Sequence, residues 1–115
     1  MKTQGRGKAK LFPLRGNSLT ILEFDNMRSI RRDTQFKKDV KRLVKRSKDL
    51  NKLKKVIRCL VRAEKLPAEN KDHQLKGVLK DCRECHIEPD WLFIYRIEGS
   101  ELCLVRTGSH SDLFG

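Results

Sequence analysis

The sequence contains no hydrophobic run of the roughly 18–20 residues that a membrane-spanning helix requires. Its basic N-terminus is not followed by the apolar stretch, about 7–15 residues long, that marks a secretory signal. We therefore predict a cytoplasmic protein that does not span a membrane, and whose four cysteines are reduced thiols. With 115 residues, the chain is long enough for one compact domain and too short for two.

Basic residues greatly outnumber acidic ones. The chain has 15 Asp and Glu against 27 Lys and Arg, which gives a net charge of +12. Residues 28–58 hold 14 of these bases and three acids, whereas residues 59–115 hold eight bases and ten acids. Such an excess on a small protein predicts a polyanionic partner, with nucleic acid as the first choice and an acidic protein or membrane surface as the second.

Three common catalytic signatures are absent: the G-x-S-x-G nucleophile elbow, the P-loop and the Rossmann fingerprint. Covalent acyl chemistry and NTP hydrolysis therefore have no support. Cys82 to His86 does spell C-x-x-C-H, the c-type haem attachment pattern. In a strand, however, residues three apart point to opposite faces, so these thiols are unsuited to gripping one haem or one metal ion. We interpret them as half-buried thiols and predict neither a metal site nor a cofactor.

Residues 1–26 differ in composition from the rest of the chain. The first ten have almost no apolar residue, and Pro13 and Gly16 interrupt the next stretch. Ser18–Phe24 is apolar enough for one short strand or one turn of helix, but no sustained period follows. We predict that residues 1–26 are an extension, either disordered or arising from an upstream start, and that residues 27–115 form the folded domain.

Apolar residues recur at helical spacing in two segments of the basic block. The first segment follows Asp33 or Thr34, either of which can cap a helix, and the second follows Asp49. The apolar positions are Phe36, Val40, Leu43 and Val44, then Leu50, Leu53, Val56, Ile57, Leu60 and Val61. Because the connection between the two segments is short, we predict an antiparallel helical hairpin. Pro67 ends the helical region.

After a polar, loop-like stretch at residues 68–77, the period changes to that of strands. The predicted strands are Leu79–Glu88, Trp91–Ile97 and Leu102–Arg106, with Arg28–Arg32 as a possible edge strand. Turns are expected at Pro89–Asp90 and at residues 98–101. The sequence therefore predicts an α+β domain in which two helices cover one face of an antiparallel sheet.

The three histidines, His73, His86 and His110, fall outside the predicted helices, in loops or at strand ends. Asp90 follows His86 by four residues, across a turn. A lone histidine is more often structural than catalytic, but loops at one end of a sheet commonly carry catalytic groups, and imidazole suits proton transfer near neutral pH. Together with the basic charge, this set points to metal-independent RNA cleavage. In that reaction a base takes the proton of a ribose 2′-OH, the oxygen attacks phosphorus, and an acid protonates the leaving 5′-oxygen.

Such a reaction also needs cations that stabilise the negatively charged phosphorane formed when the 2′-oxygen attacks. It also needs a side chain on which a nucleobase of the RNA can stack. The candidate cations are Arg83, Arg96, Arg106, Lys71 and Lys76. Phe114 is a candidate for stacking on a base. The alternative is that Phe114 plugs the core beneath the last segment, and the residues alone leave both readings open.

Three blocks resemble the YafQ-type toxins of the RelE/ParE superfamily of bacterial toxin–antitoxin systems. They are K-D-H-x-L-x-G at residues 71–77, R-E-C-H-I-E-P-D-W-L-F-I-Y at 83–95 and R-T-G-S-H-S-D-L-F-G at 106–115. The helical segment between K-D-V-K and D-L-N-K-L fits as well, so the resemblance covers about residues 28–115. It implies a microbial-ribonuclease-like fold, with an N-terminal helical hairpin packed on a small twisted antiparallel sheet.

By motif position, the resemblance implies that His73, His86, Asp90 and His110 are catalytic and that Phe114 contacts the substrate. We assign His110 as the general acid and His86 with Asp90 as the base side, while His73 would orient the phosphate or assist proton transfer.

The same blocks suggest further substrate contacts at Arg83, Glu84 and Arg106. Glu84 stands where the family usually has Asp, so the charge is kept and the carboxylate is shifted by one methylene. Leu79 and Cys82 replace aromatic residues that are common in close relatives.

The implied function is a ribosome-dependent endoribonuclease toxin of a type II toxin–antitoxin system that cleaves mRNA and inhibits translation. The expected partners are the ribosome, mRNA and a cognate acidic antitoxin that folds over the toxin. Operator DNA is expected only indirectly, through the antitoxin, and no membrane is expected. Two alternatives stay open: a ParE-like gyrase-inhibiting toxin, whose branch generally lacks this histidine set, and a non-catalytic basic RNA-binding module.

Overall fold

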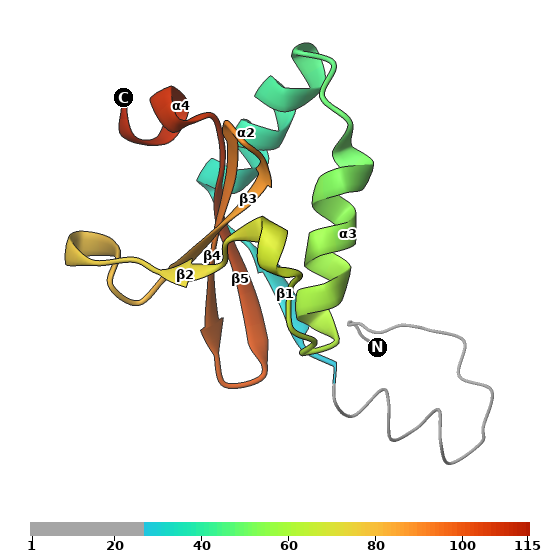
Figure 1. Ribbon diagram of the computed structural model, residues 1–115, viewed down its shortest axis with the longest axis vertical. Coiled ribbons are helices and arrows are strands. Elements are labelled where there is room, and N and C mark those ends of the chain that lie inside the picture. Colours follow the sequence, from blue (N-terminus) through green and yellow to red (C-terminus); the bar gives the residue numbers. More distant parts are fainter. Residues whose placement is uncertain (1–26) are drawn as a thin grey trace.

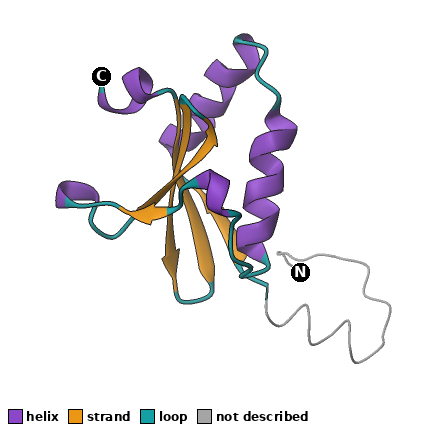
Figure 2. Cartoon of the chain, viewed as in Figure 1, coloured by secondary structure: helices purple, strands orange, loops and turns teal. Residues whose placement is uncertain are grey.

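The computed structural model describes residues 27–115 and shows two long helices beside a five-stranded sheet (Figures 1 and 2). In chain order, the elements are β1 (Ser29–Arg32), α2 (Thr34–Lys45), α3 (Leu50–Val61), η1 (Ala68–Asn70), β2 (His73–Gln74), η2 (Gly77–Leu79), β3 (Arg83–Glu88), β4 (Trp91–Glu98), β5 (Glu101–Gly108) and α4 (His110–Phe114). The predicted α+β class is confirmed. The predictions for residues 1–26, including the short element at Ser18–Phe24, lie outside the described residues.

Helices α2 and α3 form where the apolar residues follow the helical period. Their buried residues are Phe36, Asp39 and Leu43 on α2, and Leu53, Val56 and Leu60 on α3. Asp49 caps α3 by accepting a hydrogen bond of 3.0 Å from the Asn51 N–H, whereas Asp33 stands at the cap of α2 without a side-chain bond. Of the helices between residues 27 and 115, none is long and apolar enough to cross a membrane.

The five strands form one sheet in the order β1-β5-β4-β3-β2, with β1 and β2 at the edges. The strand pairs from β2 to β5 are antiparallel, but β1 pairs with β5 in parallel, and Ile30 stands opposite Leu102. The predicted edge strand is confirmed, while the prediction of a purely antiparallel sheet is wrong at this edge. The Ser29 N–H donates to the Ser100 carbonyl at 2.9 Å, so β1 starts at the end of the sheet where β5 also starts.

Strand register gives the sheet two different faces. Paired residues share a face and successive residues alternate, so the pairs His86–Leu92 and Glu84–Ile94 lie on one face. The other face packs against the helices, and its core residues are Cys85, Trp91, Phe93, Tyr95, Leu102 and Leu104. The Phe36 ring of α2 meets the Phe93 ring edge-on at 6.0 Å. Burying each large apolar side chain contributes about 1.5–3 kcal/mol, so this layer is the main source of stability.

Two short elements replace segments for which the sequence predicts loops. His73 lies in β2, a strand of two residues, and His110 begins α4 rather than lying in a loop. Both elements are too short to show a period, and both depend on contacts with distant residues. The strand predicted from Leu79 begins only at Arg83, because Gly77–Leu79 forms the turn η2.

Candidate functional site

The turn between β3 and β4 joins the segments that carry His86, Asp90 and His110. The Asp90 carboxylate accepts a hydrogen bond of 3.0 Å from the backbone N–H of His110. Nδ1 of His86 lies 3.2 Å from the carbonyl oxygen of Pro89. A carbonyl can only accept, so Nδ1 is the donor in this contact, and Nε2 is the nitrogen left to take a proton. The structure thus brings these three predicted residues together at one end of the sheet.

His73 lies on the neighbouring strand β2 and is paired with Glu84, which shares its face of β3 with His86. Nδ1 of His73 lies 2.7 Å from the Lys71 carbonyl oxygen, and Nε2 lies 3.4 Å from Oε1 of Glu84. Diagonal neighbours in a sheet are about 7–8 Å apart, which places His73 near His86. Glu84 is 7% exposed, and within residues 27–115 its buried Oε2 has no hydrogen-bond partner. That oxygen is therefore a buried acceptor whose hydrogen-bonding capacity is unsatisfied.

Helix α4 presents His110 and Phe114 on one turn. Ser109 and Asp112 form a capping box: the Asp112 N–H donates to Oγ of Ser109 at 3.1 Å, and the Ser109 N–H donates to Oδ2 of Asp112 at 2.8 Å. The rings of His110 and Phe114 are 5.3 Å apart. Because Phe114 is 47% exposed, it is not a core plug, and its ring is open to a stacking partner.

Both arginines predicted to bind the substrate are engaged with carboxylates. Arg83 donates to Asp72 at 3.0 Å, and the Tyr95 hydroxyl donates to the same carboxylate. Burial, together with this bond, raises the pKa of Tyr95, so its hydroxyl stays protonated at neutral pH. Arg106 donates to Asp39 through Nε at 2.8 Å and through Nη2 at 3.2 Å. The two guanidinium groups therefore brace the scaffold around the site.

Two charged residues that sequence reasoning did not single out, one on α2 and one at its C-cap, hold that helix against β5 and α4. Asp39 is fully buried and accepts the Thr107 N–H at 3.0 Å in addition to the two bonds from Arg106. At the end of α2, Arg46 pairs with Asp112 of α4. One signal was visible for Asp39, an acid on the apolar stripe of a basic helix. For Asp112 the only signal was its place three residues after a serine.

The cysteines offer little support for metal binding. All four are free: Cys82, Cys85 and Cys103 are buried, and Cys59 is partly buried. Burial raises the pKa of Cys85 to about 12, so this thiol does not ionise at neutral pH. The one group of three potential ligands found between residues 27 and 115 is Glu98, Glu101 and Cys103. Arg31 lies 3.6 Å from the Glu98 carboxylate and 3.1 Å from the Glu101 carboxylate, and Arg96 pairs with Glu98 at 2.9 Å, so both carboxylates already have arginine partners.

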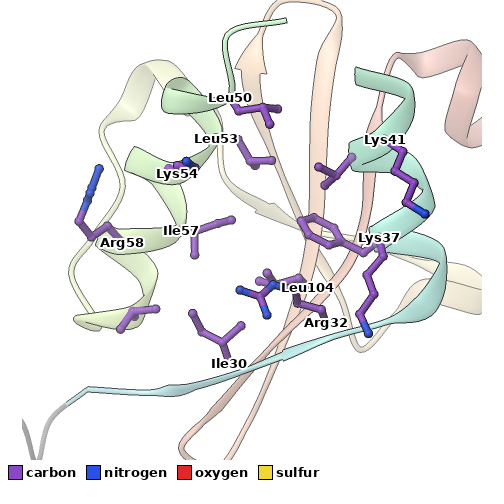
Figure 3. A pocket seen from close by; sticks show the side chains of 13 residues that line it. Ile30, Arg32, Lys37, Lys41, Leu50, Leu53, Lys54, Ile57, Arg58 and Leu104 are labelled. Carbon is purple, nitrogen blue, oxygen red and sulfur yellow. The ribbon is translucent and has the colours of Figure 1, made fainter. Parts of the chain in front are cut away.

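A pocket of about 610 Å³ separates α2 from α3 above strands β1 and β5 (Figure 3). We call it the interhelical groove. Its apolar lining includes Ile30, Phe36, Val40, Leu50, Leu53, Ile57, Val61 and Leu104, and its basic lining is Arg32, Lys37, Lys41, Lys54 and Arg58. In Figure 3, Leu50, Leu53 and Ile57 point from α3 toward α2. The groove therefore combines an apolar floor with a cationic rim.

Comparison with known proteins gives concordant matches. The family described as the bacterial toxin of type II toxin-antitoxin system, YafQ, matches residues 28–115. The mRNA interferase toxin YafQ of Escherichia coli K12 is 46% identical over 89 residues, which cover 76% of this chain and 97% of that protein. The crystal structure of YafQ from E. coli BL21(DE3) superposes with a TM-score of 0.73 at 45% identity, covering 76% of this chain and 99% of its own. YafQ in the E. coli DinJ-YafQ toxin-antitoxin complex superposes with a TM-score of 0.72 at 46% identity, covering 77% of this chain and 99% of its own.

Proposed function

Because this chain belongs to the YafQ family of type II toxin–antitoxin toxins, we propose that it is a ribosome-dependent endoribonuclease that cleaves mRNA and thereby inhibits translation. The observation that carries the proposal is the junction at the β3–β4 turn, which brings histidines from two separate elements to one end of the sheet. The name of the E. coli relative, mRNA interferase, supports the substrate class. The proposed location is the cytoplasm, where mRNA is translated.

His86 is the proposed general base and His110 the proposed general acid. With its Nδ1–H held by the Pro89 carbonyl, His86 accepts the proton of the ribose 2′-OH on Nε2. The 2′-oxygen then attacks the adjacent phosphorus, the bond from phosphorus to the 5′-oxygen breaks, and the imidazolium of His110 protonates that oxygen. The products are a 2′,3′-cyclic phosphate and a free 5′-hydroxyl. Asp90 contributes by holding the backbone of His110.

His73 is proposed to supply positive charge beside the scissile phosphate. Its Nδ1 lies 2.7 Å from the Lys71 carbonyl oxygen and its Nε2 lies 3.4 Å from Oε1 of Glu84, so an acceptor oxygen faces each ring nitrogen. Glu84 would thus act through His73. Arg83 and Arg106 remain predicted substrate contacts, and to fulfil that role they would have to give up part of their bonds to carboxylates.

The basic surfaces of α2 and α3 are proposed to dock on ribosomal RNA. Their exposed basic residues are Lys37, Lys38, Lys41, Lys45, Lys52, Lys54, Lys55 and Arg58. Lysine contacts to phosphates release counterions, so the affinity for ribosomes should fall steeply as the salt concentration rises. Docking and cleavage would then use different parts of the molecule.

The proposal is tested with purified protein and a short mRNA, either free or bound to bacterial ribosomes. We expect primer extension to show cleavage on the ribosome, leaving 2′,3′-cyclic phosphate ends, and little cleavage of free mRNA. A chain that begins at Met27 should be equally active, in line with our proposal that residues 27–115 are the toxin domain. Ribosome binding without cleavage would favour the RNA-binding module, and inhibition of gyrase without cleavage would favour the gyrase-inhibiting alternative.

We also propose that the interhelical groove binds a segment of the cognate antitoxin. The E. coli DinJ-YafQ complex shows that a family member assembles with an antitoxin. An apolar floor within a basic rim is the complement of an amphipathic, acidic segment that folds as it binds. Operator DNA would then be reached only through the antitoxin.

Placing a carboxylate in the groove should weaken this binding. The variant Ile57→Asp is expected to raise the Kd for the cognate antitoxin by about tenfold or more, because it puts an unpaired charge on the apolar floor opposite an acidic partner. Isothermal titration calorimetry measures the Kd. The matched control is Val44→Asp, at an exposed apolar position of α2 that does not line the groove. Unchanged affinity in Ile57→Asp, or equal loss in both variants, would place the antitoxin elsewhere.

A further inference from the structure

Helix α4 carries two residues of the candidate site but is too short to be stable alone. It spans only the five residues from His110 to Phe114. Isolated helices shorter than about 12 residues are marginal in water, so contacts from outside must hold this one. The position of the His110 ring therefore depends on the residues that anchor α4 to the rest of the fold.

Asp112 makes most of these anchoring contacts. The Arg46 guanidinium grips its carboxylate in a bidentate pair, with Nη1 at 2.7 Å from Oδ2 and Nη2 at 3.0 Å from Oδ1. Nη1 of Arg42 lies 3.5 Å from Oδ1. The same carboxylate accepts the Ser109 N–H at 2.8 Å. The Asp112 side chain is only 11% exposed, and its hydrogen bond with Arg46 holds its pKa well below the usual range.

The residue two positions before α4, Gly108, leaves space for the Asp112 carboxylate because it has no side chain. Gly108 has φ of +156°, and a Cβ at this position would lie 2.8 Å from Oδ2 of Asp112. Glycine therefore gives the carboxylate its room. A bidentate pair fixes orientation as well as distance, because the guanidinium is planar and rigid. The end of α2 and the start of α4, 66 residues apart between Arg46 and Asp112, are thus joined at one carboxylate.

We propose that Asp112 is a positioning residue for mRNA cleavage: through Arg46 it fixes α4 to the end of α2 and so sets the place of the His110 imidazole. The proposal rests on the ribonuclease function proposed above and adds a residue outside the histidine set. Asp112 does not touch the substrate, and its effect passes through His110. The second anchor is the bond from the His110 N–H to Asp90. Displacing a catalytic group by about 1 Å can cost about 100-fold, so the loss of one of two anchors predicts a drop of about 5- to 50-fold in kcat.

The variant Asp112→Asn isolates the link to Arg46. The amide keeps the shape of the side chain and an oxygen for the Ser109 N–H, but it removes the charge and the bidentate pairing. We expect kcat to fall while KM for ribosome-bound mRNA stays constant. Asp112→Glu should recover most of the rate, because it restores the charge at the capping-box position. Arg46→Gln should lower kcat as much as Asp112→Asn does. The double variant should lower kcat no further than either single variant, since all three break the same link.

If Arg46 and Asp112 acted only through their charges, substitutions at the two residues would change KM in opposite directions. If Arg46 only contacted ribosomal RNA and Asp112 only reduced the positive surface charge, Arg46→Gln would raise KM and Asp112→Asn would lower it. The matched control is Glu101→Gln, which breaks a 3.1 Å pair with Arg31 at the other end of the sheet and should change neither parameter. Opposite KM shifts, or additive losses of kcat in the double variant, would overturn the positioning role.

Amide hydrogen exchange separates this inference from the proposed function. In Asp112→Asn, the amides of residues 110–115 should exchange at least about tenfold faster than in the wild type, while those of β4 and β5 should not change. If the wild type cleaves no mRNA, the ribonuclease proposal fails, and the exchange rates still decide whether Asp112 fixes α4. If the wild type cleaves and Asp112→Asn equals it in rate and in exchange, the positioning role is wrong and the ribonuclease proposal stands.

Discussion

Replacing His110 with glutamine is expected to lower the rate of ribosome-dependent mRNA cleavage by about 10²–10⁴-fold. Glutamine has a similar size, but it cannot form the cation that gives a proton to the leaving 5′-oxygen. The His110 ring is exposed at the start of α4, so little packing is lost, and the midpoint of thermal unfolding should stay within a few degrees of the wild-type value. Single-turnover cleavage on mRNA-loaded ribosomes gives the rate, and circular dichroism gives the midpoint.

The control for His110 lies on the same short helix. Ser111→Gln introduces the same side chain at the neighbouring exposed position and should retain the full rate. In cells, induction of the wild type or of Ser111→Gln should arrest growth, and induction of His110→Gln should not. Full toxicity in His110→Gln, with codon-phased cleavage intact, would show that another group donates the proton.

Replacing Asp39 with alanine is expected to cost about 2–4 kcal/mol of unfolding free energy. Breaking a buried ion pair costs about 3–5 kcal/mol, because the remaining charge has no partner. Asp39 is fully buried and accepts bonds from the Arg106 side chain and the Thr107 N–H. The Arg106 side chain is 26% exposed and regains some contact with water, which lowers the expected cost. Urea unfolding of both proteins at the same pH measures the difference.

A hydrophobic replacement of the whole pair should cost about 1 kcal/mol less than Asp39→Ala. Asp39→Leu combined with Arg106→Met removes both charges together, and such exchanges of buried pairs are often neutral or stabilising. The Thr107 N–H still loses its acceptor, so we expect a loss of about 1–3 kcal/mol. Glu101→Gln, which breaks a partly exposed pair, should cost less than about 1 kcal/mol. A loss below about 1 kcal/mol in Asp39→Ala would contradict the view that this carboxylate supports β5 and the segment leading to His110.

Patterns that repeat within a few residues made much of the fold predictable. The apolar stripes of α2 and α3 repeat with the helical period, and the density of aromatic and β-branched residues from Trp91 onward is typical of a strand. The parallel pairing of β1 was out of reach, because four residues show no direction and the partner strand lies at the far end of the chain. Helix α4 was missed for a similar reason, since its five residues depend on a capping box and on Arg46.

For the candidate site, too, the sequence indicated the residues but not the contacts between them. Residue types and motif positions indicated His73, His86, Asp90 and His110 as the chemical groups. They did not indicate that Asp90 would bind the backbone of His110, nor that Arg83 would pair with Asp72 rather than stand free.

By itself, the sequence determined the two helices, the main strands, the α+β class and the chemical identity of the candidate groups, because periodicity, capping and residue type act over a few neighbouring positions. Only the tertiary structure decided which carboxylate meets which arginine. Asp39 and Arg106 are 67 residues apart and Arg46 and Asp112 are 66 apart, so these pairs form only once α2 has packed against β5. That packing buries Asp39 and anchors α4. Both effects depend on contacts between residues far apart in the chain, which patterns of neighbouring residues do not indicate.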